Sequence, residues 1–155
     1  MGLLLTLVMP YLGGFRQAAL RSQARRLAGR ATFLYDEAAG QKMVLRLTFD
    51  MDQNTYTVAS LDPYALRPAF LPDRSPAGRP VVLPAAIRIR DVSVEGIGTL
   101  NRGIISTTFY PGGYVDATVV HLEDASQHVM TLIFTPLTGK VVISDGDFMP
   151  KGMFN

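Results

Sequence analysis

His121 and His128 are the two residues of this sequence best suited to proton transfer or metal binding. They flank one predicted hairpin, so the two rings could approach each other across it. Glu123 and Asp124 lie beside them in the sequence. A metal site or a general base needs further ligands, or a nucleophile placed by a pocket. Because the turn between the two histidines is solvated, we expect both to be ordinary surface residues.

Asp50, Asp52 and Asn54 resemble the opening of a calcium-binding loop, in which oxygen ligands occupy alternate positions. The rest of the motif is absent, since no glycine comes next and no glutamate stands at the closing position. Aspartate and asparagine between two strands are also typical of a tight turn. We therefore interpret this segment as a hairpin turn.

Other catalytic arrangements find little support in the sequence. Ser106, Ser126 and Ser144 lack the strand–turn–helix setting of an activated serine. The glycines at 96–98 and 112–113 do not precede a helix, which leaves phosphate binding unsupported. The absence of cysteine excludes disulfides, thiolate metal sites and thiol catalysis. We predict a protein that is not an enzyme and that needs no metal or cofactor.

Five arginines lie within a short N-terminal stretch, where they could meet lipid phosphates or nucleic acid. They are Arg16, Arg21, Arg25, Arg26 and Arg30. We favour a solvated helix face, or pairing with acidic residues of neighbouring subunits, because the opposite face of the same helix has a packing role. The whole chain has a net charge of +2. The part after Gly40 has ten basic and eleven acidic residues, so it lacks the strongly basic character of a nucleic-acid-binding domain.

The arginines require a helix to position them, and the apolar pattern predicts one over residues 3–39. Apolar residues recur every three or four positions and should be buried against strands. They are Leu20, Ala24, Leu27, Ala31, Leu34 and Ala38. Gly40 is expected to end the helix, and Pro10 to bend it.

After Gly40 the apolar period changes to two, which predicts β-strands. The expected strands are 43–49, 55–59, 86–94, 103–109, 117–122, 128–134 and 140–143. Turns at short intervals favour an antiparallel meander. Six prolines between 61 and 85 predict a long surface loop without regular structure. The expected organisation is a hydrophobic and amphipathic helix over 1–40 and an antiparallel β domain over 41–155.

The chain opens with an apolar run that is about half the ~20 residues needed to cross a bilayer. It lacks the basic flank and the cleavage site of a secretory signal. We expect its side chains to be exposed in the isolated chain and to form a membrane or filament interface. The residues of this surface are Leu3, Leu4, Leu5, Leu7, Val8, Pro10 and Leu12.

Three segments resemble the type IV pilin-like proteins, in particular the H-type minor pseudopilin (GspH) of type II secretion systems. Residues 3–14, with the helix that follows, resemble the latter part of a pilin spine helix. Residues 45–58 resemble the first β-hairpin of that family. The third is the C-terminal pattern, Phe-Tyr-Pro-Gly-Gly at 109–113 and the later segment 132–141. The resemblance covers nearly the whole chain, although only the C-terminal pattern is moderately specific.

The resemblance implies an α+β, pilin-like fold in which a long N-terminal helix packs on an antiparallel β-sheet domain. It further implies a non-enzymatic subunit of the pseudopilus, which takes part in protein secretion across the outer membrane. Such a protein is anchored in the bacterial inner membrane by a single transmembrane helix, with its β domain in the periplasm. Its implied partners are other pseudopilins, with secreted proteins or the outer-membrane channel as further contacts.

One departure from the family concerns the N-terminus. Family members begin with a basic leader, a glycine cut by a prepilin peptidase, a phenylalanine and a glutamate. None of these precedes Met1, so we expect the chain to start within the spine helix. Peptidase cleavage, N-methylation and the glutamate's role in assembly are therefore assigned to no residue of this sequence.

Two other functions remain open at this stage. One is a minor pilin of type IV pili, which initiates fibres or takes up DNA; its DNA binding should weaken steeply with salt. The other is a membrane-anchored β domain that binds a lipid or another ligand, which requires a closed apolar pocket and no tendency to polymerise.

Overall fold

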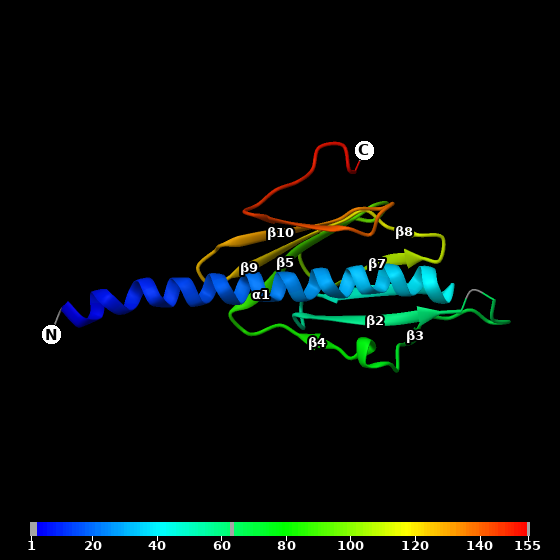
Figure 1. Ribbon diagram of the computed structural model, residues 1–155, viewed down its shortest axis with the longest axis horizontal. Coiled ribbons are helices and arrows are strands. Elements are labelled where there is room, and N and C mark those ends of the chain that lie inside the picture. The colour runs from blue at the N-terminus through cyan, green and yellow to red at the C-terminus, as the bar shows by residue number, and fades with distance from the viewer. Residues whose placement is uncertain (1–2, 63, 155) are drawn as a thin grey trace.

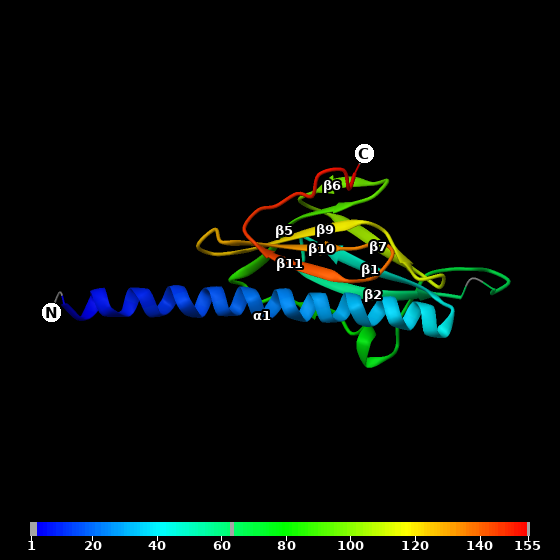
Figure 2. The ribbon, with the colours of Figure 1, turned by 45° about the horizontal axis from the view of Figure 1, so that its top comes forward.

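A long helix and two antiparallel sheets dominate the part of the chain that the structure describes (Figure 1). The computed structural model describes residues 3–62 and 64–154, with side chains from residue 14 onward. Helix α1 spans Leu3–Gln41 and is continuous through Pro10. The bend expected at Pro10 stays a prediction. In both views α1 runs beside the β domain over its C-terminal part, and its N-terminal part extends well beyond that domain (Figures 1 and 2).

The helix ends two residues later than expected. Lys42 adopts the left-handed conformation, with φ of 54°, and the Met43 amide donates to the Ala38 carbonyl at 3.2 Å. This 6→1 hydrogen bond is the mark of a Schellman cap. Gly40 therefore lies inside the last turn, and Lys42 takes the terminating position that glycine more often fills.

One stripe of α1 is buried against the sheets, as the three-to-four-residue spacing predicted. Leucines alternate along it with alanines, whose small side chains allow the helix to lie close to the strands. All six residues are at most 2% exposed: Leu20, Ala24, Leu27, Ala31, Leu34 and Ala38. Because α1 contacts strands of both sheets, it closes one side of the shared core.

The first sheet has the strand order β3-β2-β1-β7-β8, and β4 also pairs with β2. Its strands are β1 (Val44–Asp50), β2 (Thr55–Leu61), β3 (Leu71–Pro72), β4 (Val81–Val82), β7 (Ile104–Tyr110) and β8 (Tyr114–Val115). The expected hairpin between β1 and β2 is confirmed, with Asp50 opposite Thr55. Alternation places Leu45, Leu47 and Phe49 in the core, and Met43 is partly buried just before the strand.

The second sheet has the order β11-β10-β9-β5-β6. Its strands are β5 (Ile87–Val94), β6 (Gly98–Leu100), β9 (Thr118–Asp124), β10 (Val129–Phe134) and β11 (Val141–Asp145). All strand pairs are antiparallel, but β1 pairs with β7 and β5 pairs with β9. The single meander expected from the turn spacing is therefore wrong. The chain crosses between two sheets, and local turns do not encode those crossings.

Residues 64–85 of the proline-rich segment contain more regular structure than expected. They contain β3, β4 and a short 3-10 helix, η1 (Pro76–Gly78), and both strands pair with β2. Pro72 fits there because β3 lies at the sheet edge, where a missing amide donor costs no ladder bond. Val81 and Leu83 are buried. The prediction of a purely irregular surface loop is thus wrong, and the segment covers an edge that would otherwise be free to pair.

The C-terminal segment after β11 folds back over the outer face of the second sheet (Figure 2). The Thr131 hydroxyl donates to the Gly146 carbonyl at 2.7 Å and accepts from the Phe148 amide at 3.1 Å. Strand β9 is consequently buried on both faces along its whole length.

Candidate interface along the N-terminal helix

The apolar run lies on the part of α1 that extends beyond the β domain (Figure 2). Its side chains lie outside the residues whose side chains the structure describes. The expected exposure of Leu3, Leu4, Leu5, Leu7, Val8, Pro10 and Leu12 therefore stays a prediction. Within residues 3–62 and 64–154, no helix contains an apolar window long enough to span a bilayer.

The arginines of the row have different surroundings along α1. Arg16 donates to the Ser126 hydroxyl at 3.1 Å, and Arg21 lies 4.0 Å from an Asp145 carboxylate oxygen. Arg30 donates to the backbone carbonyl of Ala77. Arg25 and Arg26 are exposed. The helix geometry thus separates residues that look equivalent in the sequence.

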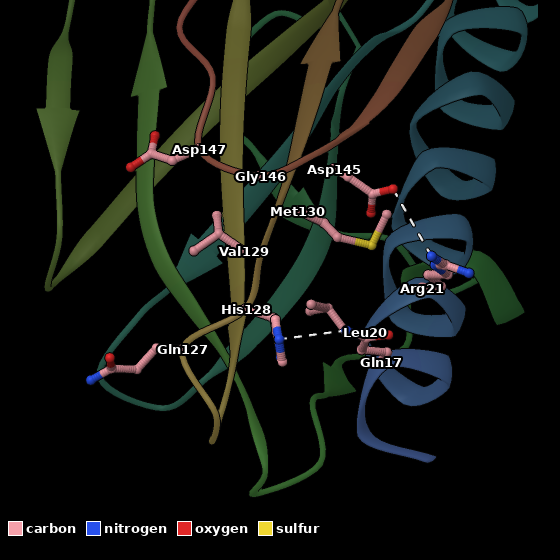
Figure 3. A pocket seen from close by; sticks show the side chains of 10 residues that line it. All are labelled: Gln17, Leu20, Arg21, Gln127, His128, Val129, Met130, Asp145, Gly146 and Asp147. Atoms are coloured by element: carbon pink, nitrogen blue, oxygen red, sulfur yellow. Dashed lines mark hydrogen bonds and ion pairs between the residues drawn. The ribbon is translucent and has the colours of Figure 1, made fainter. Parts of the chain in front are cut away.

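A recess of about 480 Å³ lies where α1 leaves the β domain, between the helix and strands β10 and β11 (Figure 3). Gln17 and Arg21 of α1 face His128 and Asp145 across it, and Met130 forms part of its apolar lining. The recess carries charges of both signs on an open surface. Such a site suits polar contact with another chain more than the enclosure of a ligand.

His128 is the surface histidine that the sequence predicted. Its side chain is 49% exposed, and Nδ1 lies 3.2 Å from a carboxylate oxygen of Asp124. The same Asp124 accepts the backbone amides of Ser126 and His128, at 2.8 and 3.0 Å. The carboxylate therefore organises the β9–β10 turn, and Ser126 is bonded to Arg16 instead of to the imidazole.

The prediction of a surface position is wrong for His121, which is only 2% exposed. Its Nδ1 lies 2.5 Å from Asp91, and its Nε2 lies 3.1 Å from the Phe148 carbonyl and 3.3 Å from Asp147. Arg90 joins both aspartates, at 2.8 and 2.9 Å. The sequence missed this cluster because the C-terminal segment that covers it lies far along the chain from Asp91.

The ring nitrogens of His121 face only acceptors, which favours the doubly protonated imidazolium. Burial lowers the pKa of His121, but the hydrogen bonds to Asp91 and to the Phe148 carbonyl outweigh it and hold that pKa above 6.5. Burial also raises the pKa of Asp91, and the bonds from His121 and Arg90 reverse this effect. Both ring nitrogens are engaged, so His121 has a structural role and is not available as a general base.

The calcium-loop residues point in different directions, which supports the hairpin interpretation. Asp50 accepts the Gln53 amide at 2.9 Å inside the turn. The Asn54 amide group reaches instead to β5, where it donates to the Ile87 carbonyl at 2.7 Å and accepts from the Ile89 amide at 3.0 Å. Within the described ranges, no three histidine or acidic side chains are placed to hold a metal ion.

Tyr35 joins the two C-terminal segments that carry the family resemblance. Its hydroxyl lies 2.7 Å from the carbonyls of both Gly113 and Leu137. A Cβ atom at Gly139, where φ is +64°, would stand 2.1 Å from the Tyr35 ring. The glycine allows both the left-handed turn and the close approach of the ring. Sequence reasoning missed this contact, although the repeated glycine-containing turns were a signal for it.

No model of a known protein family matches the chain, and no curated protein matches it in sequence. Solved structures of the minor pseudopilin EpsH from the type 2 secretion system of Vibrio cholerae match its fold. One has a TM-score of 0.65 at 12% identity, covering 85% of this chain and 98% of that one. A second has a TM-score of 0.60 at 12% identity, covering 81% and 96%.

The chain has the fold of a GspH-like minor pseudopilin. The predicted class, a pilin-like α+β fold with a long N-terminal helix on antiparallel β-sheets, is confirmed. The resemblance noted in the sequence is thereby supported in three dimensions, at a sequence identity of 12%. The N-terminal helix and the antiparallel β-sheets described above match that pseudopilin fold.

Proposed function

We propose that the chain is a structural, non-enzymatic subunit of a type II secretion pseudopilus. The observation that carries the proposal is the pseudopilin fold, which extends over nearly the full length of the EpsH structures. An N-terminal helix that extends past its own domain offers a surface that the chain's own strands do not cover (Figure 2). Such a surface suits association with other helices or with lipid.

In this proposal the apolar part of α1 inserts in the inner membrane before assembly, and the β domain lies in the periplasm. In the filament, the same part of the helix packs against helices of other pseudopilins. Lipid is itself apolar, so moving the helix from the membrane to the filament gains far less free energy than burying it from water. Specific packing and external work must therefore drive incorporation, as suits a filament built by an assembly machine.

Replacing Leu4 and Leu7 by Asp tests the proposal. The chain is produced together with the other pseudopilins of its own organism, and its membrane fraction and its cross-linking into filaments are measured. The double variant should lose both, because two carboxylates in the hydrocarbon core or a helix interface are costly. Its β domain should stay folded, which circular dichroism checks.

A matched control carries the same change at exposed positions of the β domain. Leu66 and Leu137 are fully or largely exposed, so Leu66→Asp with Leu137→Asp should incorporate like the unchanged chain. Normal incorporation of the Leu4/Leu7 variant would overturn the proposed role of the apolar run. Salt-sensitive DNA binding by the unchanged chain, without incorporation, would instead favour the type IV pilus alternative.

A further inference from the structure

A groove of about 630 Å³ runs between α1 and the turn that contains η1. One wall comes from the helix and the other from the proline-rich segment. Its lining residues are Arg26, Gly29, Arg30, Phe33, Glu37, Ser75, Pro76 and Ala77. Phe33 is 47% exposed although it stands beside a well-packed core. The groove therefore combines an open aromatic surface with charged side chains.

Arg26 and Arg30 form no ion pair among the described residues, although Glu37 also lines the groove. Arg16 and Arg21, nearer the N-terminus of α1, have polar partners in the β domain. Arg30 is held by the neutral Ala77 carbonyl, which fixes its guanidinium against the η1 turn.

Tyr56 is a buried residue on which the charges of the groove arginines act. It is only 2% exposed, and its hydroxyl has no hydrogen-bond partner among the described residues. Burial raises the pKa of the Tyr56 phenol, and the charges of Arg26 and Arg30 oppose that rise. The charges of both arginines therefore act on this buried polar group.

We propose that this groove binds an acidic segment of a neighbouring pseudopilin, whose carboxylate pairs with Arg26 and Arg30. An apolar side chain beside that carboxylate packs on Phe33 and Pro76. Charge complementarity selects this occupant, because guanidinium groups bind carboxylates through paired, charge-assisted hydrogen bonds. Glu37 lines the groove beyond Phe33 and would repel a second carboxylate, so it directs the acidic group toward the arginines.

The inference rests on the proposed function and adds the chemistry of the partner. It is tested by cross-linking in the assembled filament. Because the chain has no cysteine, Gly29→Cys creates a unique site for a thiol-linked benzophenone. A Cβ atom at Gly29 meets nothing within 4 Å, so the substitution fits the helix. Thr32→Cys is the control, since Thr32 is exposed on α1 but does not line the groove.

The expected adduct of Gly29→Cys joins a neighbouring pseudopilin at a peptide that contains Asp or Glu, as mass spectrometry of the cross-linked peptide identifies. Thr32→Cys should not give that adduct. Arg26→Glu, made together with Gly29→Cys, should lower its yield by about tenfold or more. Arg25→Glu is the matched control, because the neighbouring Arg25 is exposed outside the groove and its reversal changes the helix charge equally.

The outcomes separate this inference from the proposed function. Failure of the unmodified chain to enter filaments would overturn the proposed function and the groove assignment with it. If the chain enters filaments but Gly29→Cys labels only lipid, or a segment without acidic residues, the groove assignment alone is overturned. Equal adduct yields for Arg26→Glu and Arg25→Glu would also overturn it.

Discussion

The Nδ1 atom of His121 lies 2.5 Å from a carboxylate oxygen of Asp91, and its Nε2 atom contacts the C-terminal segment at the Phe148 carbonyl. The Phe148 carbonyl, Asp147 and Arg90 complete the surroundings of this pair. Asp147 and Phe148 belong to the C-terminal segment. Their contacts with His121 and Arg90 therefore tie that segment to β9 and β5. The charge state of His121 should therefore set part of the stability of the protein.

We expect the free energy of unfolding to fall as pH rises above 6.5. The pKa of His121 is raised above 6.5, so its contribution is complete below that pH and is lost as pH rises through the raised value. The pKa of Asp91 is lowered below 3.8, so its contribution is present above pH 3.8 and is lost as pH falls through the lowered value. Urea unfolding at a series of pH values measures both limbs.

His121→Gln should flatten the limb above pH 6.5, because the substituted side chain does not titrate. His128→Gln removes the other histidine, which is half-exposed and bonded to a different aspartate, and should keep the decline of the unchanged protein. Equal slopes for the unchanged protein and His121→Gln would contradict the assigned role of the buried pair.

Tyr35→Phe should destabilise the protein by about 1–3 kcal/mol, since the carbonyls of Gly113 and Leu137 lose their shared donor. Thermal or urea unfolding measures the change. Gly139→Ala should also destabilise, because it adds a Cβ atom to a left-handed residue in contact with the ring.

A double-mutant cycle separates the two causes at Gly139. In a Tyr35→Ala background the ring is gone, so Gly139→Ala should cost less than it does alone. The part of the cost that remains reports the left-handed backbone. Additive effects of the two substitutions would show that the ring and the glycine do not interact.

Asn54→Ala should destabilise by about 2–4 kcal/mol, because it removes two hydrogen bonds and places alanine at a φ of 54°. Asn54 belongs to the β1–β2 turn and its partners belong to β5, so the loss affects the contact between the two sheets. Asp52→Ala is the control within the same turn, since Asp52 is exposed. Equal unfolding midpoints for the two variants would contradict this assignment.

Leu27→Ala should cost about 2–5 kcal/mol in the free energy of unfolding, since Leu27 is 1% exposed and its truncation leaves a cavity between α1 and the sheets. Phe15→Ala removes a larger side chain, but one that is 70% exposed, and should change stability by about 0.5 kcal/mol or less. Urea unfolding of both variants checks whether burial, and not side-chain size, decides the cost.

The sequence alone determined the long helix, its buried stripe and the positions of most strands. These follow from local periodicity: Leu20 to Ala38 repeat every three or four residues, and Leu45, Leu47 and Phe49 alternate along one strand. Three local signals were misleading. The six prolines of residues 61–85 predict no strand, although Pro72 lies in β3. Gly40 predicts the end of the helix, which continues to Gln41, and the closely spaced turns predict a single meander.

Only the tertiary structure decided which residues from distant segments meet. The pairing of β1 with β7, the cover over His121 and the contact between Tyr35 and Gly139 join residues far apart in the sequence, and periodicity carries no information about such contacts. The same holds for the arginines. Nothing in the sequence distinguishes Arg21 from Arg26. In the folded chain Arg21 lies beside Asp145 of the second sheet, whereas Arg26 faces the open groove beside the η1 turn.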